Sequence, residues 1–337
     1  MKILITGVAG FVGMHAATRF CNDGHQVIGI DNLNDYYDVE LKKRRLAQIS
    51  EHQKFKFYRC DLARKDHLIS IFDECKPDVV LNFAAQAGVR FSIENPDSYI
   101  QSNLVGFANV LDCAKDYGVK HLIYASSSSV YGANTNLPYH EGQNVDHPLT
   151  LYGATKKANE LLAHSYSNLF KLPTTGLRFF TVYGPWGRPD MAYFKFTKAI
   201  QDGDEIEIFN YGNMDRDFTF IDDVTNAISL LLNKPPKACE DFDSRYPDPG
   251  KSSVPWEVFN IGNSNPVKLM DCVEIIERLL GKKAKKKFIE MQPGDVISTA
   301  SDCSRLAKWV NFRANTDFET GMRAFIDWYL NYFKEER

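Results

Sequence analysis

The feature that most constrains the fold of this chain is a regular alternation of two kinds of segment over its first 130 residues. Short β-rich runs are separated by longer stretches with helical spacing, and they stand at residues 2–6, 26–31, 56–61, 78–85 and 121–127. Strands that alternate with helices predict βαβ units and therefore a parallel sheet. The run around residues 79–84 is apolar without polar alternation, as expected for a strand covered on both faces. We therefore predict an α/β fold with a doubly wound parallel sheet.

Further elements follow in the second half of the chain. Residues 174–184 and 216–224 each predict one more strand, and the apolar spacing between them predicts a helix over 191–203 that ends at Gly203. Residues 233–257 contain five prolines and many charges, which predicts a surface loop before the strand at 258–262.

Composition and charge argue against several classes of protein. The 337 residues carry a net charge of −3, and the basic side chains are dispersed except for a lysine-rich run at 282–287, which we expect to solvate a helix end, so nucleic acid is not an expected partner. The sequence has neither a signal-peptide pattern nor an apolar stretch long enough for a membrane span, so we expect a cytoplasmic protein. Seven scattered cysteines without a CxxC pair predict reduced structural thiols and no metal site.

Three glycines, Gly7, Gly10 and Gly13, follow the first run in the motif GVAGFVG. Glycines permit a tight turn and bring backbone amides close to a pyrophosphate, and the N-terminus of the next helix adds its positive dipole end. Asp31 ends the second run, where a carboxylate accepts hydrogen bonds from ribose hydroxyls and repels a 2′-phosphate, so NAD is preferred over NADP. This arrangement predicts a Rossmann-like NAD site.

Other residues next to these runs complete the expected cofactor site. They are Phe11, Val12, Asn32, Asp61, Leu62, Ala84 and Ala85. Asp61 and Leu62 close the third run, where they can meet the adenine edge. The alternative for Asp61 is a plain N-cap of the following helix.

Tyr152 and Lys156 stand in the segment YGATK, a spacing that puts both side chains on one face of a helix. A lysine ammonium beside a phenol favours the phenolate and lowers the pKa of the tyrosine from about 10 toward the range of a general base. A hydroxyl from the serine row in YASSSSVYG can share the substrate oxygen with this tyrosine. The pattern predicts catalysis by Tyr152, with Lys156 also contacting the cofactor.

The motifs GVAGFVG, DNLNDYYD, NFAAQAGVRFS, YASSSSVYG, YGATK, RFFTVYGPWGRPDMA and RDFTFIDDV together resemble those of extended short-chain dehydrogenases/reductases that act on nucleotide sugars, most closely the UDP-glucuronate 4-epimerases. The resemblance covers nearly the whole chain. It implies a Rossmann domain over residues 1–180, to which a strand and helix at 215–232 return, and a smaller C-terminal α/β domain, mainly 181–214 and 233–337, that binds the UDP-sugar. It also implies retained NAD, a homodimer, and reversible oxidation of the sugar at C4 with Tyr152 taking the hydroxyl proton.

In the family, the three positions before VYG sort the chemistry, and here they are Ser127, Ser128 and Ser129. Related 4,6-dehydratases resemble Thr-Asp-Glu there and decarboxylases resemble Thr-Ser-Glu, so serine at 129 disfavours both reactions. Oxidising C4 of a glucuronate makes a β-keto acid, which loses carbon dioxide readily. Hydroxyls of Ser128 and Ser129 that hold the carboxylate would oppose this loss, since each charge-assisted bond is worth roughly 1.5 to 3 kcal/mol. Ser127 then works beside Tyr152, and Ser126 is structural.

The resemblance also assigns the remaining substrate contacts. Thr181 and Arg188 are expected at the sugar carboxylate, with a phosphate as the alternative for Arg188. Arg216 is expected at the UDP diphosphate, and Phe209 and Tyr211 at the uracil. Arg90 and Met191 complete the expected set.

Three alternatives stay open at this point. A UDP-glucose or UDP-N-acetylhexosamine 4-epimerase shares the machinery, because serines tolerate either sugar. A UDP-glucuronate decarboxylase is a second alternative. A non-catalytic NAD-binding sensor is the third, and the coexistence of Tyr152, Lys156 and Ser127 counts against it.

Overall fold

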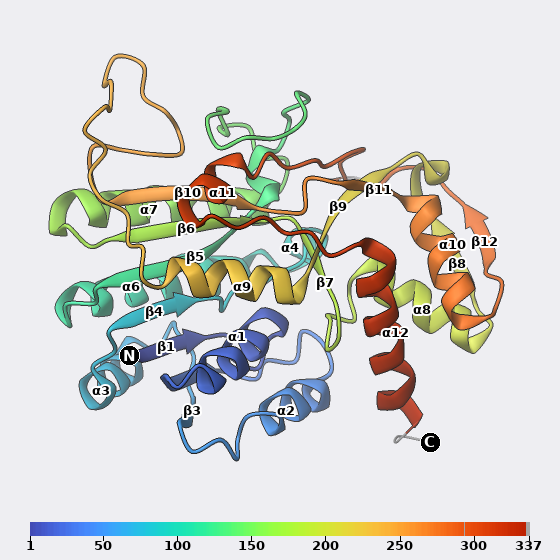
Figure 1. Ribbon diagram of the computed structural model, residues 1–337, viewed down its shortest axis with the longest axis horizontal. Helices are drawn as coiled ribbons and strands as arrows, with labels where there is room; N and C mark the ends of the chain where they lie inside the picture. Colours follow the sequence, from blue (N-terminus) through green and yellow to red (C-terminus); the bar gives the residue numbers. More distant parts are fainter. Residues whose placement is uncertain (293, 335–337) are drawn as a thin grey trace.

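The computed structural model describes residues 1–292 and 294–334, and its larger part is built on a seven-stranded sheet with the order β10-β6-β5-β4-β1-β2-β3 (Figure 1). Every pairing in this sheet is parallel. The strands are β1 (Lys2–Thr6), β2 (Gln26–Asp31), β3 (Phe55–Arg59), β4 (Val79–Asn82), β5 (His121–Ser127), β6 (Thr174–Phe179) and β10 (Trp256–Ile261). The predicted α/β class and parallel sheet are confirmed.

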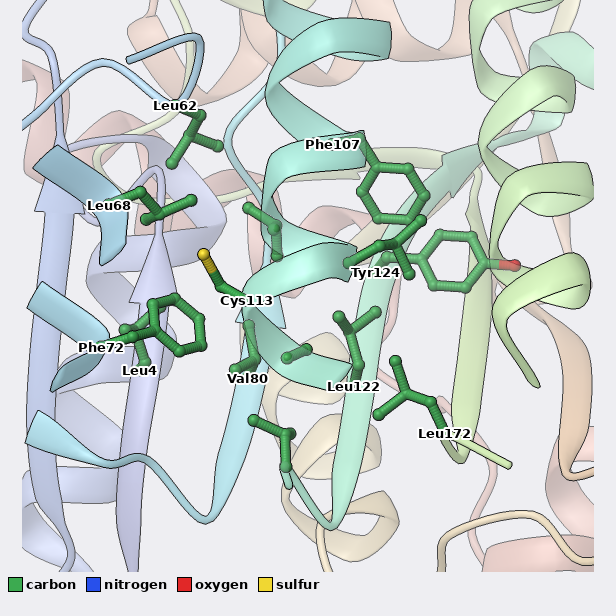
Figure 2. Packing of buried hydrophobic residues seen from close by; sticks show 14 of the residues in the cluster. Leu4, Leu62, Leu68, Phe72, Val80, Phe107, Cys113, Leu122, Tyr124 and Leu172 are labelled. Carbon is green, nitrogen blue, oxygen red and sulfur yellow. The ribbon is translucent and has the colours of Figure 1, made fainter. Parts of the chain in front are cut away.

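Helices cover both faces of the sheet because successive strand residues point to opposite sides. Leu4 and Leu122 belong to the core on one face, which Figure 2 shows at close range. The helices that contribute to this core are α3 (Lys65–Cys75), α6 (Gly106–Asp116) and α7 (Leu151–Phe170). Ile3 and Ile5 belong to the core on the other face. The helices there are α1 (Phe11–Asn22), α9 (Ile221–Leu231) and α11 (Ser304–Val310), with α2 (Val39–Ala47) beside α1.

The smaller part of the molecule, on the right in Figure 1, has two short sheets and its own aromatic core. Its elements are β7 (Thr181–Tyr183), α8 (Ala192–Asp202), β8 (Glu205–Ile208), β9 (Asp215–Phe220), β11 (Pro266–Lys268), α10 (Leu269–Leu280), β12 (Lys285–Phe288) and α12 (Phe318–Lys334). The predicted helix before Gly203 is α8, and Gly203 caps it in a left-handed conformation. The lysine-rich run follows α10 but continues into β12, so it does more than solvate a helix end.

Several short helical segments connect these elements. They are α4 (Phe91–Glu94), α5 (Pro96–Tyr99), the π-helical η1 (Ile100–Val105) and the 3-10 turns η2 (Ser128–Tyr131) and η3 (Phe209–Gly212). The predicted surface loop before β10 is confirmed, since residues 234–250 form no helix or strand.

Residues 174–184 form two strands where the sequence predicts one. The strand is interrupted at Phe180. Its amide donates to the carbonyl of Ile261 (3.1 Å), and its ring is buried beside Tyr131. β6 therefore ends in the large sheet, and β7 starts anew beside β9 in the three-stranded sheet β11-β9-β7.

Segment 215–232 returns to the larger part only through its helix. α9 packs on α1, but β9 pairs with β7 and β11 in the small sheet, so the expected return of this strand is wrong. Conversely, β10 comes from the predicted second domain and pairs with β6. The domain boundaries themselves stay a prediction, and residues 335–337 lie outside the described residues.

Candidate active site

A cavity of about 990 Å³ lies where the carboxyl ends of the parallel strands meet α8, β8 and α10 of the smaller part. Ligands of open α/β sheets bind outside the carboxyl ends of the strands. Every residue that the sequence nominates for the site lines this cavity, with the exception of Tyr211. Residues from both parts of the molecule therefore share one site.

The loop after β1 leaves no room for side chains. Gly7 has a φ of 72°, and a Cβ there would lie 2.6 Å from the amide nitrogen of Ala84. A Cβ on Gly13 would lie 2.1 Å from the carbonyl oxygen of Gly7. α1 begins at Phe11 without a side-chain cap, so its first amides keep their hydrogen-bonding capacity. This close-packed loop and uncapped helix end fit the pyrophosphate of a dinucleotide.

Asp31 ends β2 on the same cavity and organises the backbone around it. Its carboxylate accepts hydrogen bonds from the amides of Ala9 (3.0 Å) and Leu33 (2.8 Å). Burial raises the pKa of Asp31, and these bonds and the ammonium of Lys42 act in the opposite direction. A carboxylate at this place fits the ribose hydroxyls of an adenosine.

Asn32 and Asp61 join the loops after β2 and β3. The amide Nδ2 of Asn32 donates to Oδ2 of Asp61 (2.9 Å), and the other carboxylate oxygen of Asp61 accepts from the amide of Ala63 (2.9 Å). Because α3 begins at Lys65 with Arg64 at its N-cap position, Asp61 is not the helix N-cap that the sequence left open.

Helix α7 carries Tyr152 and Lys156 into the cavity from its first two turns. Thr150 caps this helix by accepting a hydrogen bond from the amide of Gly153 (3.2 Å). The ammonium of Lys156 donates to the carbonyl of Ala125 on β5 (2.9 Å) and lies 5.9 Å from the centroid of the Tyr152 ring. The helix is thereby fixed against the strand that leads into the serine row.

The protonation of this pair is set by burial. Burial lowers the pKa of Lys156 to about 7. Burial also raises the pKa of Tyr152, while the Arg188 guanidinium and a hydrogen bond with Ser127 oppose that rise. The prediction that Lys156 lowers the pKa of the Tyr152 phenol is therefore wrong. Burial raises this pKa by more than the nearby groups lower it, and the cation that acts to lower it is Arg188.

The four serines have distinct environments. The hydroxyl of Ser126 donates to the buried carboxylate of Glu160 on α7 (2.7 Å), a structural role as expected. The Ser127 hydroxyl caps η2 by accepting a hydrogen bond from the amide of Ser129 (3.1 Å). The same hydroxyl donates a hydrogen bond to the hydroxyl of Ser129 (3.2 Å). Ser127, Ser128 and Ser129 all line the cavity. The row thus gives one hydroxyl to the scaffold and three to the site.

Arg188 is already engaged by the protein. Its Nε and Nη2 donate to the two carboxylate oxygens of Asp190 (3.0 and 2.5 Å), and the hydroxyl of Tyr36 donates to the same carboxylate (3.3 Å). Burial acts to lower the pKa of Arg188, but Asp190 raises it overall. Thr181, at the start of β7, and Met191, which precedes α8, line the cavity as well.

The two other expected arginines also have partners. Arg90 lies over the ring of Phe209 (4.5 Å to the centroid), and its Nη2 pairs with Asp295 (2.9 Å). Arg216 donates to the backbone carbonyls of Asp215 (2.8 Å) and Ile297 (3.0 Å). None of these bonds is to a carboxylate, and burial lowers the pKa of the Arg216 guanidinium, while the charges of Asp295 and Asp215 act in the opposite direction.

Tyr211 does not reach the cavity, so its predicted place at the site is wrong. The side chain is 57% exposed. Asn210 and Tyr211 both have positive φ angles, 49° and 52°, within η3. This left-handed turn reverses the chain after Phe209, so the two rings do not share a face as they would on a strand.

Tyr36 and Asp190 are site residues that sequence reasoning missed. Both lie inside motifs quoted above, DNLNDYYD and GRPDMA, but no local spacing links them. Their contact joins positions 154 residues apart, which periodicity cannot reveal. The only available signal was an acidic residue two positions after Arg188.

Two further observations concern the described residues only. None of their helices is both long and apolar enough to cross a membrane. Among the same residues, no group of three or more His, Cys, Asp or Glu side chains is arranged to hold a metal ion.

Comparisons with known proteins identify the family and several relatives of this chain. A model of the NAD dependent epimerase/dehydratase family matches residues 3–242. Protein CapI of Staphylococcus aureus is 54% identical over 99% of this chain and 100% of its own. A probable UDP-glucuronate 4-epimerase of Rhizobium meliloti (strain 1021) is 45% identical, covering 98% of this chain and 97% of its own. The crystal structure of the Bacillus cereus UDP-glucuronic acid 4-epimerase with UDP-glucuronic acid and NAD has a TM-score of 0.88 at 30% identity, over 98% of this chain and 100% of its own.

Proposed function

This chain belongs to the NAD dependent epimerase/dehydratase family, and from that premise we propose that it is an NAD-dependent isomerase that interconverts UDP-glucuronate and UDP-galacturonate. One observation carries the proposal. A single cavity contains the glycine loop, the Tyr152 phenol, the Ser127 hydroxyl, and the further hydroxyls and Arg188 that suit a sugar carboxylate. Bound NAD accepts and returns a hydride at C4 of the sugar, so the reaction has no net redox change.

The residues have separate tasks in this proposal. As a phenolate, Tyr152 takes the proton of the 4-hydroxyl and later returns it, Ser127 shares that oxygen, and Lys156 orients the helix through its bond to Ala125. Burial raises the pKa of Tyr152, and the positive charge of Arg188 acts in the opposite direction and favours the phenolate. The cofactor is held by the glycine loop, with Asp31 at its ribose. Arg216 offers a positive charge for the diphosphate, and Phe209 a ring for the uracil.

The carboxylate of the sugar is the group that needs protection. After oxidation at C4 the sugar is a β-keto acid, and loss of carbon dioxide withdraws charge from its carboxylate. Donors that hold the anion oppose this loss, and Ser128, Ser129, Thr181 and Arg188 supply them in this cavity. The residues at positions 128 and 129 are serines and not the acidic residues of dehydratases, which supports epimerisation.

Proton NMR of the purified protein with UDP-glucuronate tests the proposal, with UDP-glucose and UDP-N-acetylglucosamine in parallel. We expect UDP-galacturonate to form without UDP-xylose. In Tyr152→Phe the rate should fall by about 10² to 10⁴, the usual contribution of a general base, while UDP-glucuronate still binds. Untouched UDP-glucuronate beside an epimerised neutral sugar would refute the substrate assignment.

A UDP-glucose 4-epimerase is the second candidate, and one observation favours it. Asp190 already occupies Nε and Nη2 of Arg188, so a neutral sugar would leave no unpaired guanidinium behind. The ratio of kcat/KM for UDP-glucuronate and UDP-glucose decides between the two, since our proposal requires it to exceed 10.

We also propose a homodimer in the cytoplasm. Apolar side chains on α7 and η1 are exposed, namely Leu161, Leu169, Phe170, Ile100 and Val105, and their burial against a second copy would be favourable. All seven cysteines are free thiols, which suits a reducing compartment. Light scattering after gel filtration should give twice the chain mass of 38.4 kDa, and Leu161→Glu together with Leu169→Glu should halve it.

A further inference from the structure

Arg45 on α2 is a buried cation whose partners are all neutral. The side chain has no exposed surface. Its Nε and Nη2 donate to the carbonyl of Trp186 (3.1 and 2.7 Å), and Nη2 also donates to the carbonyl of Gly187 (3.0 Å). Its Nη1 donates to the carbonyl of Ala9 (3.2 Å) and to the hydroxyl of Tyr37 (2.6 Å). A guanidinium has five N–H groups, so these bonds use its whole capacity.

These bonds join three loops that surround the cavity. Ala9 belongs to the glycine loop, and its amide donates to the carboxylate of Asp31 (3.0 Å). Tyr37 belongs to the loop after β2, which also brings Tyr36 to Asp190. Trp186 and Gly187 directly precede Arg188. Arg45 therefore touches the cofactor loop on one side and the loop of the carboxylate-binding arginine on the other.

The loop before Arg188 needs such support. Trp186 has a φ of 63°, a left-handed conformation that is unfavourable for a residue with a side chain. Its carbonyl accepts two of the Arg45 bonds. Burial of a cation is itself unfavourable, and filling this space with an apolar side chain would avoid that cost. The presence of a buried guanidinium at position 45 is therefore better explained by the loops that it joins than by the space that it fills.

We propose that Arg45 is a positioning residue that couples the dinucleotide-binding loop to the loop that presents Arg188 to the sugar carboxylate. The part of this inference that concerns Arg188 rests on the proposed function. Ordering the glycine loop around NAD fixes the Ala9 carbonyl, which fixes Arg45 and in turn the Trp186–Gly187 peptide. Because such coupling is reciprocal, binding of the acidic sugar strengthens the grip on NAD by the same factor.

Hydrogen–deuterium exchange of residues 184–191, with and without NAD, tests the coupling independently of the substrate. The variant is Arg45→Lys, because a lysine keeps the charge but cannot span the three carbonyls. The matched control is Arg44→Lys on the same helix, where Arg44 lies near Glu40 (3.8 Å) and over the Tyr332 ring (4.9 Å). We expect NAD to slow exchange in 184–191 at least fivefold in the wild type and the control, and less than twofold in Arg45→Lys.

A second readout is the product ratio with UDP-glucuronate. A loosened Arg188 holds the carboxylate less well, so the fraction of decarboxylated UDP-pentose should rise at least fivefold in Arg45→Lys and stay unchanged in Arg44→Lys. A residue that only packs would lower total activity and melting temperature at a constant product ratio. Equal NAD protection of 184–191 in Arg45→Lys and wild type would overturn the proposal.

Tyr37→Phe keeps the proposal testable if Arg45→Lys does not fold. It removes one acceptor of the guanidinium and leaves the three carbonyls in place, so NAD protection of 184–191 should fall about twofold. Unchanged protection there would also contradict the coupling. If the wild type leaves UDP-glucuronate untouched, the proposed function fails, whereas the exchange experiment still decides the role of Arg45.

Discussion

The two halves of the cavity differ in what lines them: backbone groups on one side and side chains on the other. The half that suits the cofactor is mostly backbone, with a glycine loop in which added Cβ atoms would lie 2.1 to 2.9 Å from backbone atoms and a carboxylate that accepts hydrogen bonds from amides. The half that suits the sugar is made of side chains, and its charged ones already have partners: Arg188 with Asp190 and Arg90 with Asp295. A backbone site tolerates almost no substitution, whereas a side-chain site is adjustable, which explains how one fold serves several sugars.

Gly13→Ala should have the largest effect, because it breaks the backbone half. The new Cβ would lie 2.1 Å from the Gly7 carbonyl oxygen, so the loop must move, and the amides that we propose bind the pyrophosphate would move with it. We expect NAD affinity to fall at least 100-fold, measured by isothermal titration. Gly203→Ala is the control: it also adds a methyl group, but after α8 and with open space around it, so it should change stability alone.

Ser129→Ala probes the side-chain half and should have a smaller, more specific effect. The loss of one charge-assisted donor to the carboxylate costs roughly 1.5 to 3 kcal/mol, so decarboxylation should rise by about tenfold or more relative to epimerisation. The UDP-xylose to UDP-galacturonate ratio by NMR measures this. Ser165→Ala, whose hydroxyl bonds the Leu162 carbonyl within α7, should leave the ratio unchanged. An unchanged product ratio in Ser129→Ala would mean that the serines accept the sugar carboxylate without protecting it from decarboxylation.

Lys156 stands between the two halves, and its effect should depend on pH. Its pKa is lowered by burial to about 7 from 10.5 in the unfolded chain. The unfolded chain therefore binds more protons between these values, so the contribution of Lys156 to stability is complete above pH 10.5 and is lost as pH falls to 7. Relative to Lys156→Met, the melting temperature of the wild type should rise by about 3 °C from pH 7 to pH 9.5. A constant difference would contradict the depressed pKa.

Arg90→Ala should give the smallest effect. The side chain is 43% exposed, and exposed ion pairs contribute little. We expect the KM for UDP-glucuronate to change less than about threefold and the melting temperature by less than 2 °C. A tenfold rise in KM would instead assign Arg90 to the diphosphate.

The backbone half was accessible from sequence, and the side-chain half only in part. Local periodicity and residue spacing predicted the strands, the glycine loop and the pair Tyr152 and Lys156, and the structure has each of them at the predicted place. The interruption of the strand at Phe180 was not predictable, because it depends on a hydrogen bond to Ile261, which lies 81 residues further along the chain. The expectation that Tyr211 lies at the site did not allow for the left-handed turn at Asn210 and Tyr211. The pairing of Arg188 with Asp190 and the bonds of Arg45 depend on tertiary contacts that residue spacing does not encode.

The most direct test of the account uses UDP-glucuronate deuterated at C4, followed by NMR with the purified protein and NAD. We expect UDP-galacturonate that retains deuterium at C4, because the hydride leaves and returns within one site, and we expect no UDP-xylose. Loss of the label to solvent, or UDP-xylose as the main product, would contradict it.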